Sequence, residues 1–131
     1  PATHTDKTAV GFKFYFPKFI LSYSGDTALS KELIEGLIGS TVLILNVPYP
    51  GDKAQGQNLD SISAKQIISK VQPKLAIITH FGLEMLKADP LEEARQIQRD
   101  TGVPTIAATD GLVVTPEQFG EYKGPVKGYD N

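Results

Sequence analysis

The chain has 131 residues, 40% of them hydrophobic, and a formal net charge of −2. That length suits one domain with a buried core. Cysteine is absent, which excludes disulfides and thiolate metal sites. The 13 basic residues are scattered, so the sequence gives no electrostatic signal for nucleic acid. We find no apolar run long enough to span a membrane and no signal peptide, and therefore expect a cytoplasmic protein.

The chain starts at Pro1 rather than at methionine. Processing, proteolysis or truncation would each give such a start. We therefore expect it to be a fragment of a longer protein.

The first predicted element is a hairpin. Residues 10–16, VGFKFYF, alternate between two faces with period two, which is typical of a half-buried strand. Pro17 and Lys18 interrupt the pattern, and residues 19–24 resume it.

A helix and a buried strand are predicted next. From Asp26 onward, leucines recur at a spacing of four between Leu29 and Leu37, and Gly39 ends the helical pattern. Residues 41–47, TVLILNV, are almost wholly apolar, as expected of a strand covered on both faces. A loop rich in proline, glycine and polar residues follows.

The second half of the chain repeats this alternation. A helix is predicted over 61–71, a buried strand over 74–79, and a surface helix from Asp89 to about Asp100. The side chains expected to face inward from the first of these helices are Ile62, Ile67, Ile68 and Val71. The alternation of strands and helices indicates an α/β fold.

The end of the chain predicts a second hairpin and a loose tail. Strands over 105–109 and 112–115 flank Asp110 and Gly111, a strong type I′ turn signal. Residues 116–131 have no period and are expected to be loosely structured.

Polar residues gather where the predicted strands end. Right-handed crossovers make the strands 19–24, 41–47 and 74–79 parallel, so Asp26, Asn46 and His80 are expected at one edge of the sheet, where ligands bind in open α/β sheets. His4 can join them if the first hairpin folds back at Pro17. Imidazole and carboxylate are ligands that zinc accepts when thiolates are absent.

Each of these residues also has a simpler interpretation. Asp26 can be a helix cap or a first-turn acid, and His4 a frayed terminal residue. His80 can be a hydrogen-bonded structural histidine, Asn46 a buried polar residue, and Asp110 a turn residue. Spacing alone does not decide between these alternatives.

Five segments in this order resemble the carboxyl-terminal half of a metallo-β-lactamase fold metallohydrolase of the RNase Z-like or archaeal branch. They are PATHTDKTAVGFKFYF, ILSYSGDT, TVLILNVPYP, KLAIITHFG and IAATDGLVV. The resemblance covers residues 1–115. It implies half of an αββα sandwich, a mixed β-sheet with helices mainly on one face.

The resemblance also implies a set of metal ligands. It makes His4 and His80 ligands and Asp26 the carboxylate that bridges two divalent metal ions, with zinc expected and iron or manganese also accepted. The implied activity is that of a metal-dependent hydrolase, in which metal-activated hydroxide attacks an ester, amide or phosphodiester.

Some features of that family are missing. The HxHxDH motif, which supplies the other ligands and the acid that orients water, is absent, and Asn58 stands where the family usually has a histidine. The tRNA-processing members carry a long arm where only Pro17 and Lys18 stand here, which argues against tRNA 3′-end processing.

We therefore expect part of a hydrolase that is inactive alone and has no identifiable catalytic residue beyond its ligands. The expected partner is the amino-terminal half of the fold or a second copy of the chain, because the face of Phe12, Phe14 and Phe16 would otherwise lack cover. The substrate is expected to be a small molecule or a phosphodiester. Two alternatives stay open: a self-sufficient, doubly wound receiver-like binding or regulatory domain, and the non-catalytic half of a pseudo-enzyme.

Overall fold

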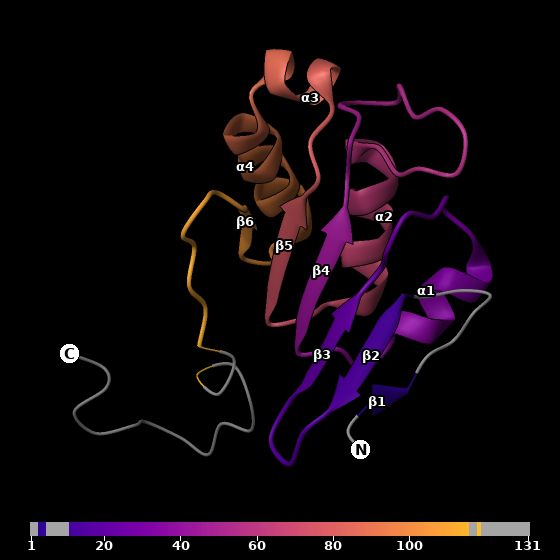
Figure 1. The fold of residues 1–131 in the computed structure, drawn as a ribbon, viewed down its shortest axis with the longest axis vertical. Helices are drawn as coiled ribbons and strands as arrows, with labels where there is room; N and C mark the ends of the chain where they lie inside the picture. The colour runs from indigo at the N-terminus through magenta and orange to yellow at the C-terminus, as the bar shows by residue number, and fades with distance from the viewer. Residues whose placement is uncertain (1–2, 5–10, 116–117, 119–131) are drawn as a thin grey trace.

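The computed structural model describes residues 11–115 and 118, together with the backbone of residues 3–4, as one mixed sheet with helices (Figure 1). The sheet has six strands in the order β1-β2-β3-β4-β5-β6. The strands are β1 (Thr3–His4), β2 (Phe12–Tyr15), β3 (Ile20–Tyr23), β4 (Val42–Asn46), β5 (Leu75–Thr79) and β6 (Thr105–Ala107). The helices are α1 (Lys31–Leu37), α2 (Ser61–Val71), α3 (Leu83–Ala88) and α4 (Pro90–Thr101).

The strand directions agree with the sequence pattern. β2 and β3 form the predicted antiparallel hairpin, closed by a hydrogen bond from Phe16 N to Phe19 O (3.0 Å). From β3 through β6, each strand pairs in parallel with the next. The carboxyl ends of β3, β4 and β5 consequently meet at one edge of the sheet, as predicted from the crossovers.

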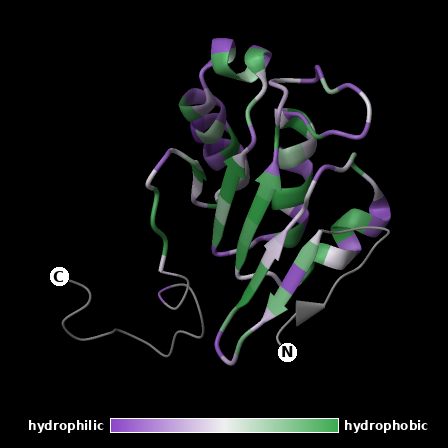
Figure 2. Cartoon of the chain, viewed as in Figure 1, coloured by the Kyte–Doolittle hydropathy of each residue, from purple (hydrophilic) through white to green (hydrophobic). Residues whose placement is uncertain are grey.

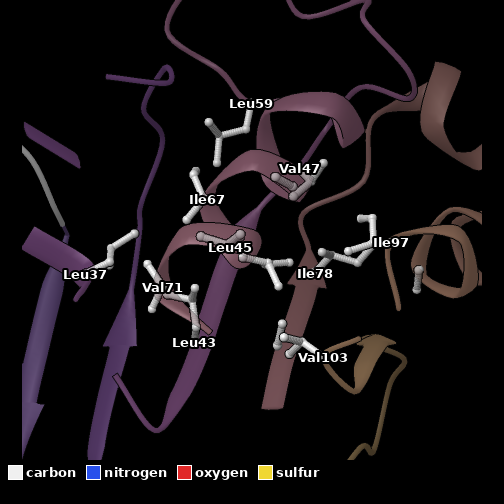
Figure 3. Close-up of a cluster of buried hydrophobic side chains, with 14 of the residues drawn as sticks. Leu37, Leu43, Leu45, Val47, Leu59, Ile67, Val71, Ile78, Ile97 and Val103 are labelled. Carbon is white, nitrogen blue, oxygen red and sulfur yellow. The ribbon is translucent and has the colours of Figure 1, made fainter. Parts of the chain in front are cut away.

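The helices α1, α2 and α4 cover one face of this sheet (Figure 1). Alternate residues of β4 and β5, including Leu43, Leu45 and Ile78, point into the main core and are fully buried there. Ile67 from α2 and Ile97 from α4 meet them (Figure 3). Burying such side chains is the main stabilising contribution in the fold, at about 1.5–3 kcal/mol each.

The opposite face of the sheet is apolar too, but it has little cover. Among the described residues, three of its hydrophobic side chains are buried, Val42, Leu75 and Ile77. On β2 and in the turn after it, Phe12 and Phe16 remain 42% and 40% exposed. Figure 2 shows β4 and β5 as the most hydrophobic strands, whereas α4 is largely hydrophilic. The expected exposure of the aromatic face is therefore present in the structure.

The helix after Asp26 starts later than predicted. Ser30 is the N-cap of α1, and its Oγ accepts a hydrogen bond from Leu33 N (3.0 Å). Asp26 lies outside the first turn, so its interpretation as the cap of this helix is wrong. Serine competes well for this position because its short side chain reaches the backbone N–H three residues on.

Three further features of the structure differ from what the sequence pattern led us to expect. Ile62 is 41% exposed, and Ala64 takes the inward position on α2. α3 was not predicted. Residues 112–115 form no strand, because only Gly111 of the Asp110–Gly111 turn has a positive φ (+82°), whereas a type I′ turn needs two such residues.

The described helices are all short. The longest, α4, has 12 residues, and no described helix is long and apolar enough to cross a membrane. The predicted loose tail over 116–131 lies outside the described residues except for residue 118.

Candidate metal centre

The segment after β3 places Asp26 at the carboxyl edge of the sheet. Ser24 Oγ accepts a hydrogen bond from Asn46 N (3.0 Å) and donates one to the carbonyl of Gly25 (2.9 Å). Gly25 then turns the chain with φ +68°, a conformation that glycine adopts at little cost. Asp26 follows this turn with an exposed side chain. The Ser-Gly-Asp sequence thus has a local physical function, which is to project a carboxylate from the strand end.

A close approach on the hairpin side supports the same turn. Gly11 N donates to Ser24 O (3.0 Å), and a Cβ atom at Gly11 would lie 2.9 Å from the carbonyl oxygen of Tyr23. No real Cβ atom tolerates that distance. A side chain at residue 11 would therefore push the hairpin away from the segment that holds Asp26.

His80 follows β5 directly, and its backbone is strained. Its φ of +63° lies in the left-handed region, which costs a non-glycine residue about 1 kcal/mol or more. The next turn is held by Gly82, which donates to Pro48 O (3.1 Å), and a Cβ atom there would lie only 3.0 Å from that oxygen. The strained conformation aims the imidazole of His80 across the sheet edge towards Asp26.

The two side chains meet across β4. His80 Nε2 lies 3.8 Å from Asp26 Oδ1, and both side chains are more than half exposed. This distance is too long for a hydrogen bond. Two ligands of one tetrahedral zinc, with bonds of about 2.0 Å, are roughly 3.3 Å apart. The observed separation is longer than this, so the pair matches a divalent cation in the chemistry of its donors, but the two atoms must move closer together to share one tetrahedral zinc.

Asn46 connects this pair to the sheet. Its Nδ2 donates to Asp26 Oδ1 (2.9 Å) and to the hydroxyl oxygen of Tyr23 (2.9 Å). The Asn46 side chain is buried, and its Oδ1 has no hydrogen-bond partner among the described residues. The position of Asn46 at a strand end predicted its place at this edge. Tyr23 was not predicted as part of the site, because the sequence marks it only as a strand residue that alternates with its neighbours.

The third predicted ligand is not placed beside the other two. The backbone of His4 pairs with Lys13, in the row of Ser22 and Leu43, away from the edge at which Asp26 lies. The side chain of His4 lies outside the described residues, so its role as a ligand stays a prediction. Within the described part of the chain, no group of three or more His, Cys, Asp or Glu residues could hold a metal ion.

The loop before α2, where the resemblance leads one to expect a histidine, is folded on itself. Asn58 Nδ2 donates to Gln55 O in the same loop (2.7 Å). Asp60 ends this loop as the N-cap of α2, with Oδ1 accepting from Ser63 N (2.8 Å). Neither Asn58 nor Asp60 is therefore oriented by a contact with Asp26 or His80.

Among known proteins, the sequence matches no family model. It is similar to the uncharacterised protein MJ1374 of Methanocaldococcus jannaschii, with 32% identity over 118 residues. The match covers 86% of this chain and 44% of that protein. The chain thus spans less than half the length of this relative.

Solved structures with the same arrangement also exceed the chain in length. The metallo-β-lactamase fold protein YhfI of Bacillus subtilis is 12% identical, with a TM-score of 0.69 over 84% of this chain and 46% of that one. The metallo hydrolase Igni18 of Ignicoccus hospitalis is 20% identical, with a TM-score of 0.56 over 87% and 49%. A diphosphatase of the PhnP family is 18% identical, with a TM-score of 0.54 over 86% and 40%.

These likenesses define the fold. The chain has an α/β fold of the metallo-β-lactamase type, with a mixed sheet and helices that cover one face. The match in each case covers less than half of the larger protein.

Proposed function

We propose that this chain is the carboxyl-terminal half of a metal-dependent hydrolase of the RNase Z-like or archaeal branch, with Asp26 as the ligand that bridges two metal ions. The observation that carries the proposal is the convergence of Asp26 and His80, 3.8 Å apart, at the carboxyl edge of the sheet. A helix cap would have explained Asp26 without a metal, but Ser30 has that function. The neighbours in fold include a metallo hydrolase and a diphosphatase.

The residues of this chain would act on the metal ions rather than on the substrate. Asp26 and His80, with His4, would hold the ions, and the turn at Gly25 and the strained backbone of His80 would keep the donors in place. Divalent cations, when bound, supply an acidified water as nucleophile and polarise the bond to be cleaved. We propose zinc as the metal, with iron or manganese as the other candidates.

The missing half of the site is proposed to come from the rest of a longer chain. Three observations support this. The match covers 44% of its relative, the apolar sheet face opposite the helices has little cover, and the described residues bring together only two of the three proposed ligands. An amino-terminal half that packs on this face would bury Phe12 and Phe16 and would bring further ligands to the same edge. A second copy of this chain is the alternative cover.

The proposed substrate is a small ester, amide or phosphodiester. The test uses the full-length gene product that contains this chain, stripped with a chelator and reloaded with zinc, iron or manganese. Hydrolysis of p-nitrophenyl acetate and of bis(p-nitrophenyl) phosphate is then followed. We expect at least one probe to be cleaved only after a metal is returned. Equal turnover by the stripped and the reloaded protein would reject the proposal.

A further inference from the structure

We infer that Asn46 is a positioning residue for Asp26, and that Tyr23 holds the side chain of Asn46 in place through a second hydrogen bond. The inference rests on the proposed function, because it assigns to Asp26 the role of a metal ligand. It concerns two residues that do not themselves touch the metal ions. Tyr23 lies on β3, Asn46 lies on the neighbouring strand β4, and Asp26 follows the turn at Gly25.

The orientation of the Asn46 amide follows from its partners. A carboxylate can only accept hydrogen bonds, so the group that faces Asp26 must be the amide nitrogen. The two hydrogens of Nδ2 are then used on Asp26 Oδ1 (2.9 Å) and on the Tyr23 hydroxyl oxygen (2.9 Å). In this orientation the Tyr23 hydroxyl accepts the second hydrogen and holds the side chain of Asn46 in place. The opposite orientation is disfavoured because it would turn the amide oxygen towards the carboxylate of Asp26.

Folding alone does not explain an asparagine at this position. Asn46 is 3% exposed, lies between the fully buried Leu45 and Val47, and leaves its Oδ1 without a hydrogen-bond partner among the described residues. A buried polar atom without a partner is destabilising. The attachment of β4 to the turn after β3 is made by the Asn46 backbone, whose N–H donates to Ser24 Oγ (3.0 Å). The side chain is therefore not needed for that attachment.

The contact with Asn46 determines how Asp26 presents its carboxylate. Asn46 Nδ2 and His80 Nε2 both approach Oδ1, at 2.9 Å and 3.8 Å. Oδ2 has no hydrogen bond to any residue in the described part of the chain. An exposed carboxylate without such a partner would rotate freely. Partners that orient a ligand in this way typically change metal affinity by about 10- to 100-fold.

The test is a titration of the full-length, metal-free protein with Co²⁺, followed by its absorption spectrum, together with the melting temperature measured without metal. Asn46→Leu keeps the branched shape of the side chain and removes the donor. We expect it to bind Co²⁺ about 10- to 100-fold more weakly while its metal-free melting temperature does not fall. Tyr23→Phe should weaken binding in the same direction by a smaller factor.

A double variant separates positioning from a general structural effect. If Asn46 acts through Asp26, Asn46→Leu should cause no further loss of affinity in an Asp26→Ala background. Asn46→Ser repeats the test with a smaller side chain if the leucine variant fails to fold. Wild-type affinity in Asn46→Leu, or an equal loss with and without Asp26, would overturn the inference while the proposed function stands. An Asp26→Ala variant that binds Co²⁺ as the wild type does would overturn both.

Discussion

Asp26 and His80 leave different strands, β3 and β5, and yet His80 Nε2 lies 3.8 Å from Asp26 Oδ1 above the end of β4. Both side chains are more than half exposed, so burial does not force them together. Each is placed by a residue with positive φ, Gly25 for the carboxylate and His80 itself for the imidazole. Gly25 adopts this conformation at little cost, whereas the backbone strain at His80 is of a kind typical of functional sites. We therefore propose that Asp26 and His80 are a pair of metal donors rather than a contact made for stability.

Replacing His80 should separate its backbone strain from its ligand function. His80→Ala and His80→Gly both remove the imidazole, but only glycine adopts a φ of +63° without strain. We expect the glycine variant to be more stable than the alanine variant by about 1 kcal/mol, measured by urea unfolding of the metal-free protein. Both variants should lose metal affinity to the same extent. Equal stabilities would show that the backbone of His80 stores no strain.

The uncovered sheet face should make the isolated 131-residue chain associate. Phe12 and Phe16 are 42% and 40% exposed on this face, and exposed apolar surface of this kind favours contact between molecules. We expect dimers or larger species in light scattering at micromolar concentration, and less association in a Phe12→Ser, Phe16→Ser double variant. Leu83→Ser is the control, since Leu83 is 68% exposed on α3 and away from this face. A monomer for the unmodified chain would contradict the prediction.

Lys13 should stabilise the carboxyl end of α1. Its Nζ donates to Gly36 O (3.1 Å) and Ile38 O (2.8 Å), where the last carbonyls of the helix have no other partner within it. Lys13→Met keeps the aliphatic part of the side chain and should reduce the free energy of unfolding by about 1 kcal/mol. Lys18→Met, at the exposed hairpin turn, is the control and should have no measurable effect. Equal effects of the two substitutions would rule out the cap.

Asp100 should make a small stability contribution that depends on pH. The side-chain hydrogen bond from Gln96, followed by that from Lys65, lowers the pKa of this carboxyl below its ordinary 3.8. A lowered pKa in the folded state means that the contribution is present above pH 3.8 and is lost as the pH falls through the folded value. We expect Asp100→Asn to be slightly less stable than the wild type at pH 7, with the difference shrinking in acid. A difference that grows as the pH falls would contradict this sign.

Hydrophobic periodicity predicted the framework well, because long apolar patterns such as 41–47 and 61–71 leave few alternatives. Periodicity failed where the boundaries or the existence of a helix depended on local contacts rather than on an apolar stripe. Ser30 is the N-cap of α1, a position for which Asp26 was the alternative candidate. α3 buries only Met85 and leaves Leu83 and Leu86 exposed, so no helical stripe marks it in the sequence.

The sequence predicted which residues lie at the candidate site, but not the contacts between them. The positions of Asp26, Asn46 and His80 at strand ends follow from topology, which a sequence pattern encodes. The hydrogen bonds from Asn46 to Tyr23 and Asp26 depend on side-chain positions across separate strands, which periodicity does not encode.

We propose Asp26 as the bridging ligand of a two-metal hydrolytic site. The most direct measurement compares bound metal and metal-dependent hydrolysis in the full-length wild type, in Asp26→Ala and in Asp52→Ala, which removes an exposed acid from the loop before α2. We predict that Asp26→Ala binds metal more weakly and loses all metal-dependent turnover, whereas Asp52→Ala keeps the affinity and the turnover of the wild type. Retained metal-dependent turnover in Asp26→Ala would contradict the assignment.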